Sequence, residues 1–172
     1  MVPVSTRPRS SARRPVRSGR GFTLIEVIIT VAIVGILAMA VLPLAQVTMQ
    51  RAKESELRIA LRQTREAIDA YKQAVDEGRV TRRANESGYP KSLEILVEGV
   101  EDAKDPDKKK IYFLRRIPRD PLASESSDAP SQTWGKRSYA SPPDEPKAGD
   151  DVFDLYSLNT GAGLNGVRYR EW

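Results

Sequence analysis

Gly21-Phe22-Thr23-Leu24-Ile25-Glu26 joins an arginine-rich start of the chain to a long apolar run. From Val27 to Ala45 this run contains no charged residue. The carboxylate of Glu26 lies just inside the N-terminal edge of the run, where contact with hydrocarbon is costly unless a partner of opposite charge is present. The fold and the functional hypotheses both start from this junction.

The chain has 172 residues and a formal net charge of +5, but the positive charge is concentrated in the first 21 residues. This leader carries six arginines and no acidic residue, and the remainder has 22 basic and 23 acidic side chains. Because the remainder is nearly neutral and has no basic face interleaved with aromatic residues, we expect no nucleic-acid binding. The Arg-, Ser- and Pro-rich composition of the leader predicts disorder.

The chain contains neither cysteine nor histidine. Disulfides and thiolate metal sites are therefore excluded, and the commonest general base and metal ligand is missing. The sequence also lacks the glycine-rich phosphate-binding motifs and the nucleophile elbow of hydrolases. We do not expect an enzyme, although Ser/Lys or paired-carboxylate chemistry keeps a membrane-anchored periplasmic enzyme as an alternative.

The apolar run from Phe22 to Val47 predicts a membrane-spanning helix. Its 26 residues would form a helix about 39 Å long, whereas the hydrocarbon core of a bilayer is about 30 Å thick. The adjacent arginines predict a single-pass protein with a cytoplasmic N-terminus and the body across the membrane. A cleaved secretory signal ending at Ala38-Met39-Ala40 is the alternative, but the apolar run continues beyond that point.

The junction after a basic leader resembles the class III signal of type IV pilins and type II secretion pseudopilins. The resemblance implies that a prepilin peptidase cleaves after Gly21 and N-methylates Phe22. Glu26 would then be the fifth residue of the mature chain, as in that family. Gly35 and Pro43 fall where many members carry residues that loosen the helix.

Cleavage before Phe22 would create an α-amine that Glu26 of a neighbouring subunit can neutralise. Each charge alone in an apolar fibre would cost several kcal/mol, and pairing offsets much of this cost. The alternative is a glutamate that extends to the membrane interface, which its terminal position permits.

Beyond the membrane, apolar residues at spacings of three and four predict that the helix continues as an amphipathic helix. The stripe consists of Leu57, Leu61, Thr64, Ile68, Tyr71 and Val75. The other faces carry Lys53, Glu54, Arg58, Arg62, Arg65, Glu66 and Lys72. Gly78 is the predicted stop. The domain prediction is a removed leader (1–21), a transmembrane and polymerisation helix (22–50), its amphipathic continuation (51–78) and a periplasmic head (79–172).

The head pattern predicts a small α+β domain. A turn at Gly88-Tyr89-Pro90 precedes a predicted short helix, and short strands are expected near Arg137–Ala140 and Val152–Leu158. Residues 105–110, 122–133 and 141–150 are expected to form loops. Together with the resemblance to pilins and pseudopilins, this pattern implies a pilin-like α+β fold, in which a long N-terminal helix packs on a small antiparallel sheet.

Several head motifs resemble the major (G-type) pseudopilin of type II secretion. They are Tyr89-Pro90, Ile117-Pro118-x-Asp120-Pro121, Trp134-Gly135 with Tyr139, Phe153-Asp154-Leu155-Tyr156-Ser157-Leu158 and Trp172. One departure is that twelve residues separate the Asp-Pro from the Trp-Gly, which usually follow each other directly in that family.

The second departure concerns a calcium-binding loop of that family. The corresponding residues 159–166 contain no carboxylate, whereas calcium prefers six to eight oxygen ligands including carboxylates. A calcium site near Leu158, Asn159 and Asn165 is therefore one hypothesis. The favoured alternative is a loop held by its own hydrogen bonds, with no cofactor.

The resemblance implies a pseudopilin that polymerises into a periplasmic fibre and drives protein export across the outer membrane. The implied partners are the prepilin peptidase, further copies of the chain, minor pseudopilins and the inner-membrane assembly platform. A type IV pilin or minor pilin for adhesion, motility or DNA uptake is the nearest alternative. The absence of a cysteine pair that could close a C-terminal loop favours secretion.

Overall fold

The computed structural model describes residues 21–124 and 128–172, with the backbone alone at 40–43. The leader predicted for residues 1–21 therefore lies outside the described residues except for Gly21. In chain order the elements are α1 (Leu24–Asp76), α2 (Glu94–Glu98), β1 (Val100–Glu101), β2 (Lys110–Ile111), the 3-10 helix η1 (Pro130–Gln132), β3 (Trp134–Arg137), β4 (Asp154–Ser157) and the 3-10 helix η2 (Tyr169–Glu171). The chain divides into two compact units between Pro43 and Leu44.

The apolar run forms the first part of α1, as predicted. Every side chain described from Gly21 to Met39 is exposed. Within the described residues, α1 is the one helix long and apolar enough to cross a membrane. The helix assignment continues through Gly35 and Pro43, so the flexibility expected at these two positions stays a prediction.

The amphipathic stripe of α1 is confirmed. Leu57, Thr64 and Ile68 are at most 1% exposed, and Leu61 and Val75 are also buried. These side chains face the head, where each buried leucine or isoleucine contributes about 1.5–3 kcal/mol relative to an exposed one.

A glycine-based C-cap ends α1 where the sequence predicts. The N–H of Gly78 donates to the carbonyl of Val75 (2.9 Å), and the N–H of Arg79 donates to the carbonyl of Ala74 (2.8 Å). This pair of bonds is the Schellman arrangement, which requires a left-handed residue at its centre. Gly78 has a φ of 73° and meets that requirement without a steric penalty.

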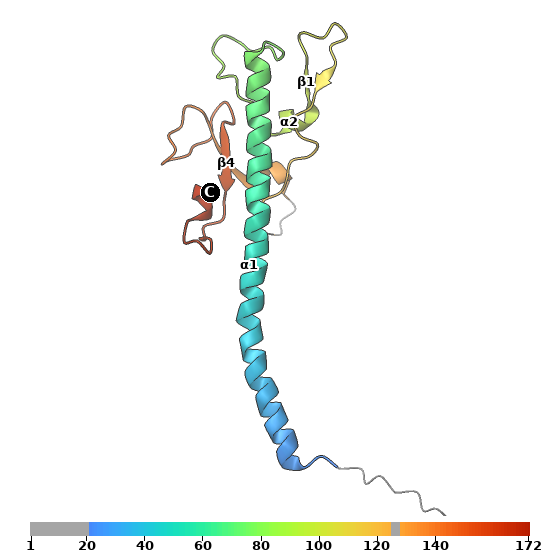
Figure 1. Cartoon of the computed structure of the whole chain (residues 1–172). Coiled ribbons are helices and arrows are strands. Elements are labelled where there is room, and N and C mark those ends of the chain that lie inside the picture. The colour runs from blue at the N-terminus through green and yellow to red at the C-terminus, as the bar shows by residue number, and fades with distance from the viewer. Residues whose placement is uncertain (1–20, 125–127) are drawn as a thin grey trace, which may run out of the picture. The chain divides into compact units, whose positions relative to one another are not determined.

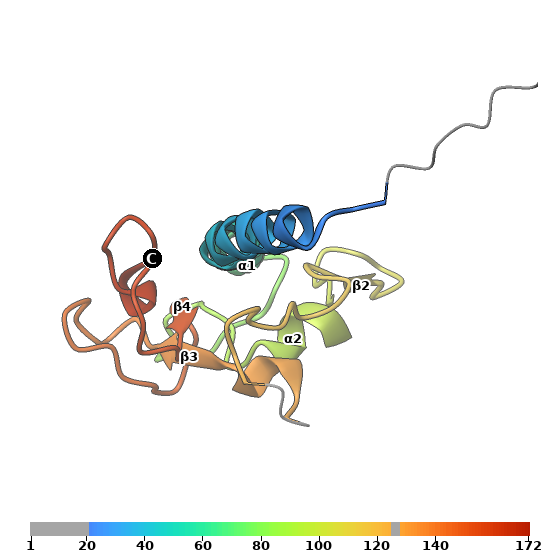
Figure 2. The same cartoon turned by 90° about the horizontal axis from the view of Figure 1, so that it is seen from below.

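The head packs on one side of the second part of α1. In the view of Figure 1, β4 and the C-terminal segment lie to the left of the helix, and α2 and β1 lie to its right. The view from below in Figure 2 shows that all of them cover the same face of the helix. The buried cluster between them combines Leu57, Leu61 and Ile68 of α1 with Leu93, Leu96, Leu114, Trp134, Val152, Leu155 and Tyr169. The pilin-like α+β fold class is therefore confirmed.

Among residues 21–124 and 128–172 the strands form two separate antiparallel pairs. β3 pairs with β4 from Trp134 opposite Ser157 to Arg137 opposite Asp154. β4 lies within the predicted strand 152–158, whereas β3 begins three residues before the strand expected near Arg137–Ala140 and ends at Arg137. The pair β1–β2 was not predicted, because each of its strands has only two residues and shows no alternation. The predicted loop at residues 105–110 connects these two strands, although Lys110 belongs to β2.

Hydrogen bonds join the two ends of the segment that separates the Asp-Pro from the Trp-Gly. The main-chain N–H of Asp120 donates to Thr133 Oγ1 (3.1 Å), and Trp134 Nε1 donates to the carbonyl of Pro118 (2.8 Å). Ser131 and Thr133 are buried. The C-terminal end of the predicted loop 122–133 is therefore packed into the head, which differs from the expectation of a loop throughout.

Candidate processing and assembly site

The predicted processing residues lie at the start of α1. Residues 21–23 are not helical, and the first helical hydrogen bond runs from the N–H of Val27 to the carbonyl of Thr23 (3.2 Å). Thr23 Oγ1 also accepts a hydrogen bond from the N–H of Glu26 (3.3 Å). Thr23 is thus the N-cap of α1, and Glu26 occupies the third helical position.

The bond predicted to be cleaved is accessible in this arrangement. The side chain of Phe22 is 80% exposed, and among the described residues no atom beyond the chain neighbours lies within 4 Å of the position that a Cβ would take on Gly21. A protease needs an extended and exposed segment, and the cap at Thr23 keeps the Gly21–Phe22 bond outside the helix. Within the described part of the chain, the Glu26 carboxylate makes no ion pair, so its charge is available to another molecule.

Thr23 was not singled out from the sequence. A usable signal was present, since Thr-x-x-Glu at 23–26 immediately before an apolar run has the pattern of a capping box. The sequence therefore predicted the charge at this site and missed the residue that positions it.

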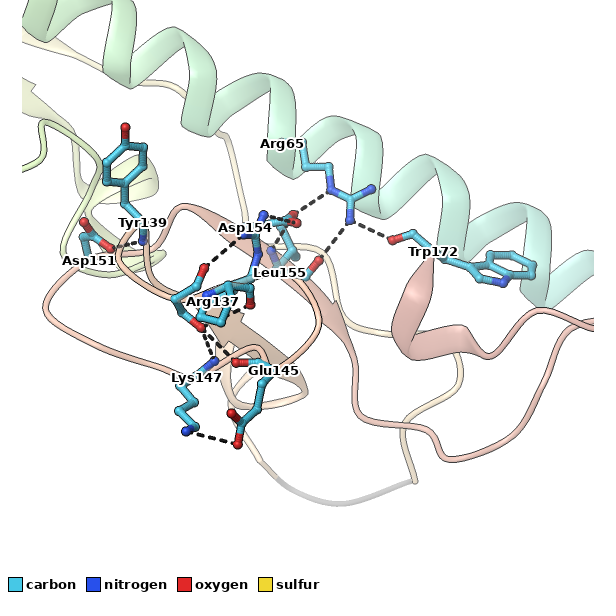
Figure 3. A network of polar contacts seen from close by, with 11 residues as sticks. Arg65, Arg137, Tyr139, Glu145, Lys147, Asp151, Asp154, Leu155 and Trp172 are labelled. Atoms are coloured by element: carbon cyan, nitrogen blue, oxygen red, sulfur yellow. Dashed lines mark hydrogen bonds and ion pairs between the residues drawn. The ribbon is translucent and has the colours of Figure 1, made fainter.

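In the head, Arg65 ties α1 to β4 and to the C-terminal segment (Figure 3). Its Nε donates to Asp154 Oδ1 (2.8 Å), and its Nη2 donates to the main-chain oxygens of Leu155 (3.2 Å) and Trp172 (2.7 Å). Arg137 lies on the other side of Asp154, with Nη2 at 3.3 Å from Oδ2. A charged fork that binds three acceptors fixes the relative position of these segments.

Asp151 organises the turn beside β3. Its carboxylate accepts hydrogen bonds from the hydroxyl of Ser87, the hydroxyl of Ser138 (2.7 Å) and the N–H of Tyr139 (2.9 Å). Burial alone would raise the pKa of Asp151, but these three hydrogen bonds together hold the pKa below its ordinary value.

The prediction that Glu54 lies on a polar face of the helix is wrong. Glu54 is 5% exposed, and its Oε1 accepts hydrogen bonds from the N–H of Leu164 (2.9 Å), the hydroxyl of Tyr169 (3.0 Å) and Nε2 of Gln50 (3.0 Å). Position 54 precedes Leu57 by three residues and so continues the buried stripe. This spacing could have predicted its burial, but the charge of Glu54 suggested an exposed position. Burial raises the pKa of the Tyr169 hydroxyl beside it.

The residues of the calcium hypothesis lie in a loop with many internal hydrogen bonds. Asn159 Oδ1 accepts from the N–H of Gly161 (2.8 Å), and Asn165 Oδ1 accepts from the N–H of Val167 (3.1 Å). Asn159 Nδ2 also donates to the carbonyl of Leu122 (3.0 Å), and Leu158 is exposed. Among the described residues no group of three or more acidic side chains could hold a metal ion.

Comparisons with known proteins agree with the junction and with the head. Residues 17–42 match the family model described as the prokaryotic N-terminal methylation motif. Over 155 residues the chain is 26% identical to the type II secretion system core protein G of Dickeya chrysanthemi, which covers 87% of this chain and 94% of that protein. No solved structure matches. The predicted resemblance to the type II secretion pseudopilins is thereby confirmed.

Proposed function

We propose that the chain is a pseudopilin subunit of a type II secretion system, which polymerises into a periplasmic fibre that drives protein export across the outer membrane. The methylation motif and the similarity to core protein G along most of the chain support this function. The observation that carries it is the position of that motif on an exposed apolar helix whose first turn holds a single carboxylate, Glu26.

Processing is the first step of the proposed function. The prepilin peptidase cleaves after Gly21 and methylates the new N-terminus at Phe22. The non-helical conformation of residues 21–23 and the exposure of Phe22 support this step, because both keep the bond within reach of the peptidase.

Assembly is the second step. The amine of Phe22 in one subunit pairs with the carboxylate of Glu26 in its neighbour, and the apolar faces of α1 cover one another. The exposure of the described side chains from Gly21 to Met39 supports this role, since such a surface requires lipid or protein to cover it.

The location and the other partners follow from the same function. The subunit spans the inner membrane once, with its N-terminus in the cytoplasm and its head in the periplasm. Minor pseudopilins and the inner-membrane assembly platform receive it. Its role is structural, with Gly35 and Pro43 supplying flexibility to the helix during packing.

Glu26→Gln tests the proposal, because it removes the charge and keeps the shape. We expect normal cleavage after Gly21 but a loss of fibres by about ten-fold or more, since an unpaired amine in an apolar fibre costs several kcal/mol. Cleavage is followed by mass spectrometry, and fibres by cross-linking and electron microscopy. Glu56→Gln, which alters an exposed carboxylate beyond the apolar run, is the matched control.

Unchanged fibre formation in both Glu26→Gln and Glu26→Leu would refute the assembly role. Deletion of the gene separates secretion from the pilus alternative. A strain that keeps exporting its substrates but loses twitching or transformation would assign the fibre to a type IV pilus.

A further inference from the structure

The C-terminal segment forms a small hairpin at one end of the head. Ala162 and Arg168 form an antiparallel bridge, and the N–H of Gly163 donates to the carbonyl of Val167 (2.9 Å). The N–H of Gly166 closes the turn on the carbonyl of Gly163 (2.8 Å). We call residues 162–168 the tail hairpin.

The tail hairpin and the residue after it are hydrogen bonded to α1 shortly after the end of the apolar run in the sequence. Its Leu164 N–H donates to Glu54, and Tyr169, which directly follows it, accepts a hydrogen bond from Gln50 Nε2 (3.1 Å). Gln50 and Glu54 lie three and seven residues beyond Val47, or about 5–10 Å along a helix axis. The attachment therefore follows the end of the apolar run by one to two helical turns.

The tail hairpin presents apolar side chains that the head does not cover. Leu164 at its turn is 46% exposed, Val167 is 40% exposed, and Leu158, shortly before the tail hairpin, is 56% exposed. Side chains of this size lose stabilisation when they remain in water, and a membrane interface accepts them.

Basic residues lie next to the attachment points on α1 and within the C-terminal segment. Arg51 and Lys53 on α1 and Arg168 on the tail hairpin are exposed, and none of them makes an ion pair within the described part of the chain. Arg170 is also exposed, and its guanidinium lies 5.6 Å from the ring of Tyr156. The nearby acidic residues are Glu54, which is buried and hydrogen bonded, and the exposed Glu56 and Glu171. Positive charge therefore exceeds negative charge at this end of the head.

We propose that the tail hairpin, together with Arg51 and Lys53, binds the anionic phospholipid surface of the membrane that α1 spans. This proposal rests on the membrane span of the proposed function. Because the tail hairpin and the apolar run belong to one chain, insertion of the run keeps the tail hairpin near a bilayer at a high effective concentration. Exposed apolar side chains among basic ones are the combination that anionic interfaces attract. The contact seats the head on the membrane before the subunit enters a fibre.

The absence of cysteine permits site-specific labels on the full chain. Single-cysteine variants at Leu164 and at Thr160 carry an environment-sensitive fluorophore, and Thr160→Cys leaves both Leu164 and Val167 intact. A label at Leu37 reports insertion of α1, and a label at Lys109, in the loop between β1 and β2, reports the head away from the tail hairpin. The full-length chain is placed in phosphatidylcholine bilayers with or without phosphatidylglycerol, and lipids spin-labelled near the headgroup quench the fluorophore.

In phosphatidylglycerol bilayers we expect at least about two-fold stronger quenching at Leu164 and Thr160 than at Lys109. Arg51→Gln with Lys53→Gln, or high salt, should remove most of this difference, since each basic residue near an anionic surface changes binding by about five-fold. Quenching at Leu37 without quenching at Leu164 or Thr160 would overturn the proposal and leave the span intact. Absence of quenching at Leu37 would overturn the span itself. A change at the tail labels that depends on protein concentration and not on phosphatidylglycerol would assign the surface to a second copy of the chain.

Discussion

Thr23 separates the bond predicted to be cleaved from the carboxylate predicted to guide assembly. Its hydroxyl accepts the N–H of Glu26, and its carbonyl accepts the first helical hydrogen bond from Val27. One residue, Thr23, therefore fixes where α1 begins. It also fixes how many residues between Phe22 and Glu26 are helical. A shift of the start by one residue would rotate the carboxylate by about 100° around the helix axis.

Thr23→Val should loosen the start of α1. Valine keeps the branched shape but removes the acceptor, at a cost of about 1 kcal/mol, so the amide proton of Glu26 should exchange with solvent about five-fold faster. Hydrogen exchange measured by NMR in detergent micelles reports this change. Thr23→Ser should retain slow exchange. Thr30→Val, the same change at another exposed threonine of α1, should have no effect on this amide, and equal rates in Thr23→Val and the original chain would contradict the cap.

At this scale the sequence predicted what is local and missed what depends on distant segments. Gly21, Phe22 and Glu26 belong to one short motif, so their candidate roles followed from adjacent residues. Glu54 is buried because Leu164 and Tyr169, more than a hundred positions later, supply hydrogen-bond donors to it. From the sequence alone, a charged residue on a helix is predicted to face solvent, because the distant donors that would allow its burial are not visible in the local pattern.

Among the elements, β3 and β4 show why a glycine follows Trp134. Gly135 lies opposite Tyr156 in the strand pair, and a Cβ at Gly135 would lie 2.3 Å from Cε2 of that ring. The tyrosine ring therefore occupies the space that any side chain at position 135 would need.

Gly135→Ala should destabilise the head by about 1–3 kcal/mol, because the ring of Tyr156 must move out of its position. Urea unfolding followed by the fluorescence of the buried Trp134 measures this loss. Adding Tyr156→Ser should recover part of the stability by removing the ring. Gly35→Ala, at a glycine with no atom within 4 Å of the added Cβ, is the control and should leave the unfolding of the head unchanged. A double variant no more stable than Gly135→Ala would contradict the steric explanation.

The loop after β4 should keep its structure without calcium. The amide oxygens of Asn159 and Asn165 already accept main-chain hydrogen bonds two residues ahead, as in Asx-turns. We expect the same melting temperature in millimolar calcium and in a chelator, monitored by circular dichroism. Asn159→Ala should lower the melting temperature equally in both solutions. An increase with calcium that disappears in Asn159→Ala would establish the site instead.

The long elements were predictable and the short ones were not. α1 is 53 residues long, and its amphipathic stripe repeats from Leu57 to Val75, so the stripe and the end at Gly78 could be read directly. β1 and β2 have two residues each. The loop between them turns back on itself, and the N–H of Asp102 donates to the carbonyl of Lys109 (3.0 Å). Contacts across the chain, rather than local pattern, determine such strands.

Across the whole head, four carboxyl groups share the same electrostatic behaviour. Hydrogen bonds lower the pKa of Asp102 through Arg79, of Glu86 through Lys91 and of Glu94 through Ser131. Asp151 is lowered by its three donors despite the opposing effect of burial. Their partners lie in the segment after α1, in the 3-10 helix η1 and in the turn beside β3, so their protonation affects the packing of several parts of the head.

A folded-state pKa below the unfolded value gives stability that is complete above the unfolded pKa, about 4, and is lost as the pH falls through the folded value. The free energy of unfolding of the head should therefore stay level from pH 7 to about pH 5 and decrease below about pH 4, as measured by urea unfolding at each pH. Asp151→Asn should cost about 1 kcal/mol at pH 7 and make the decrease shallower, since asparagine does not titrate. Asp144→Asn, at an exposed carboxylate, should reproduce the profile of the original chain. A profile for Asp151→Asn parallel to the original through pH 3 would show that this carboxylate does not contribute to the acid sensitivity of the head.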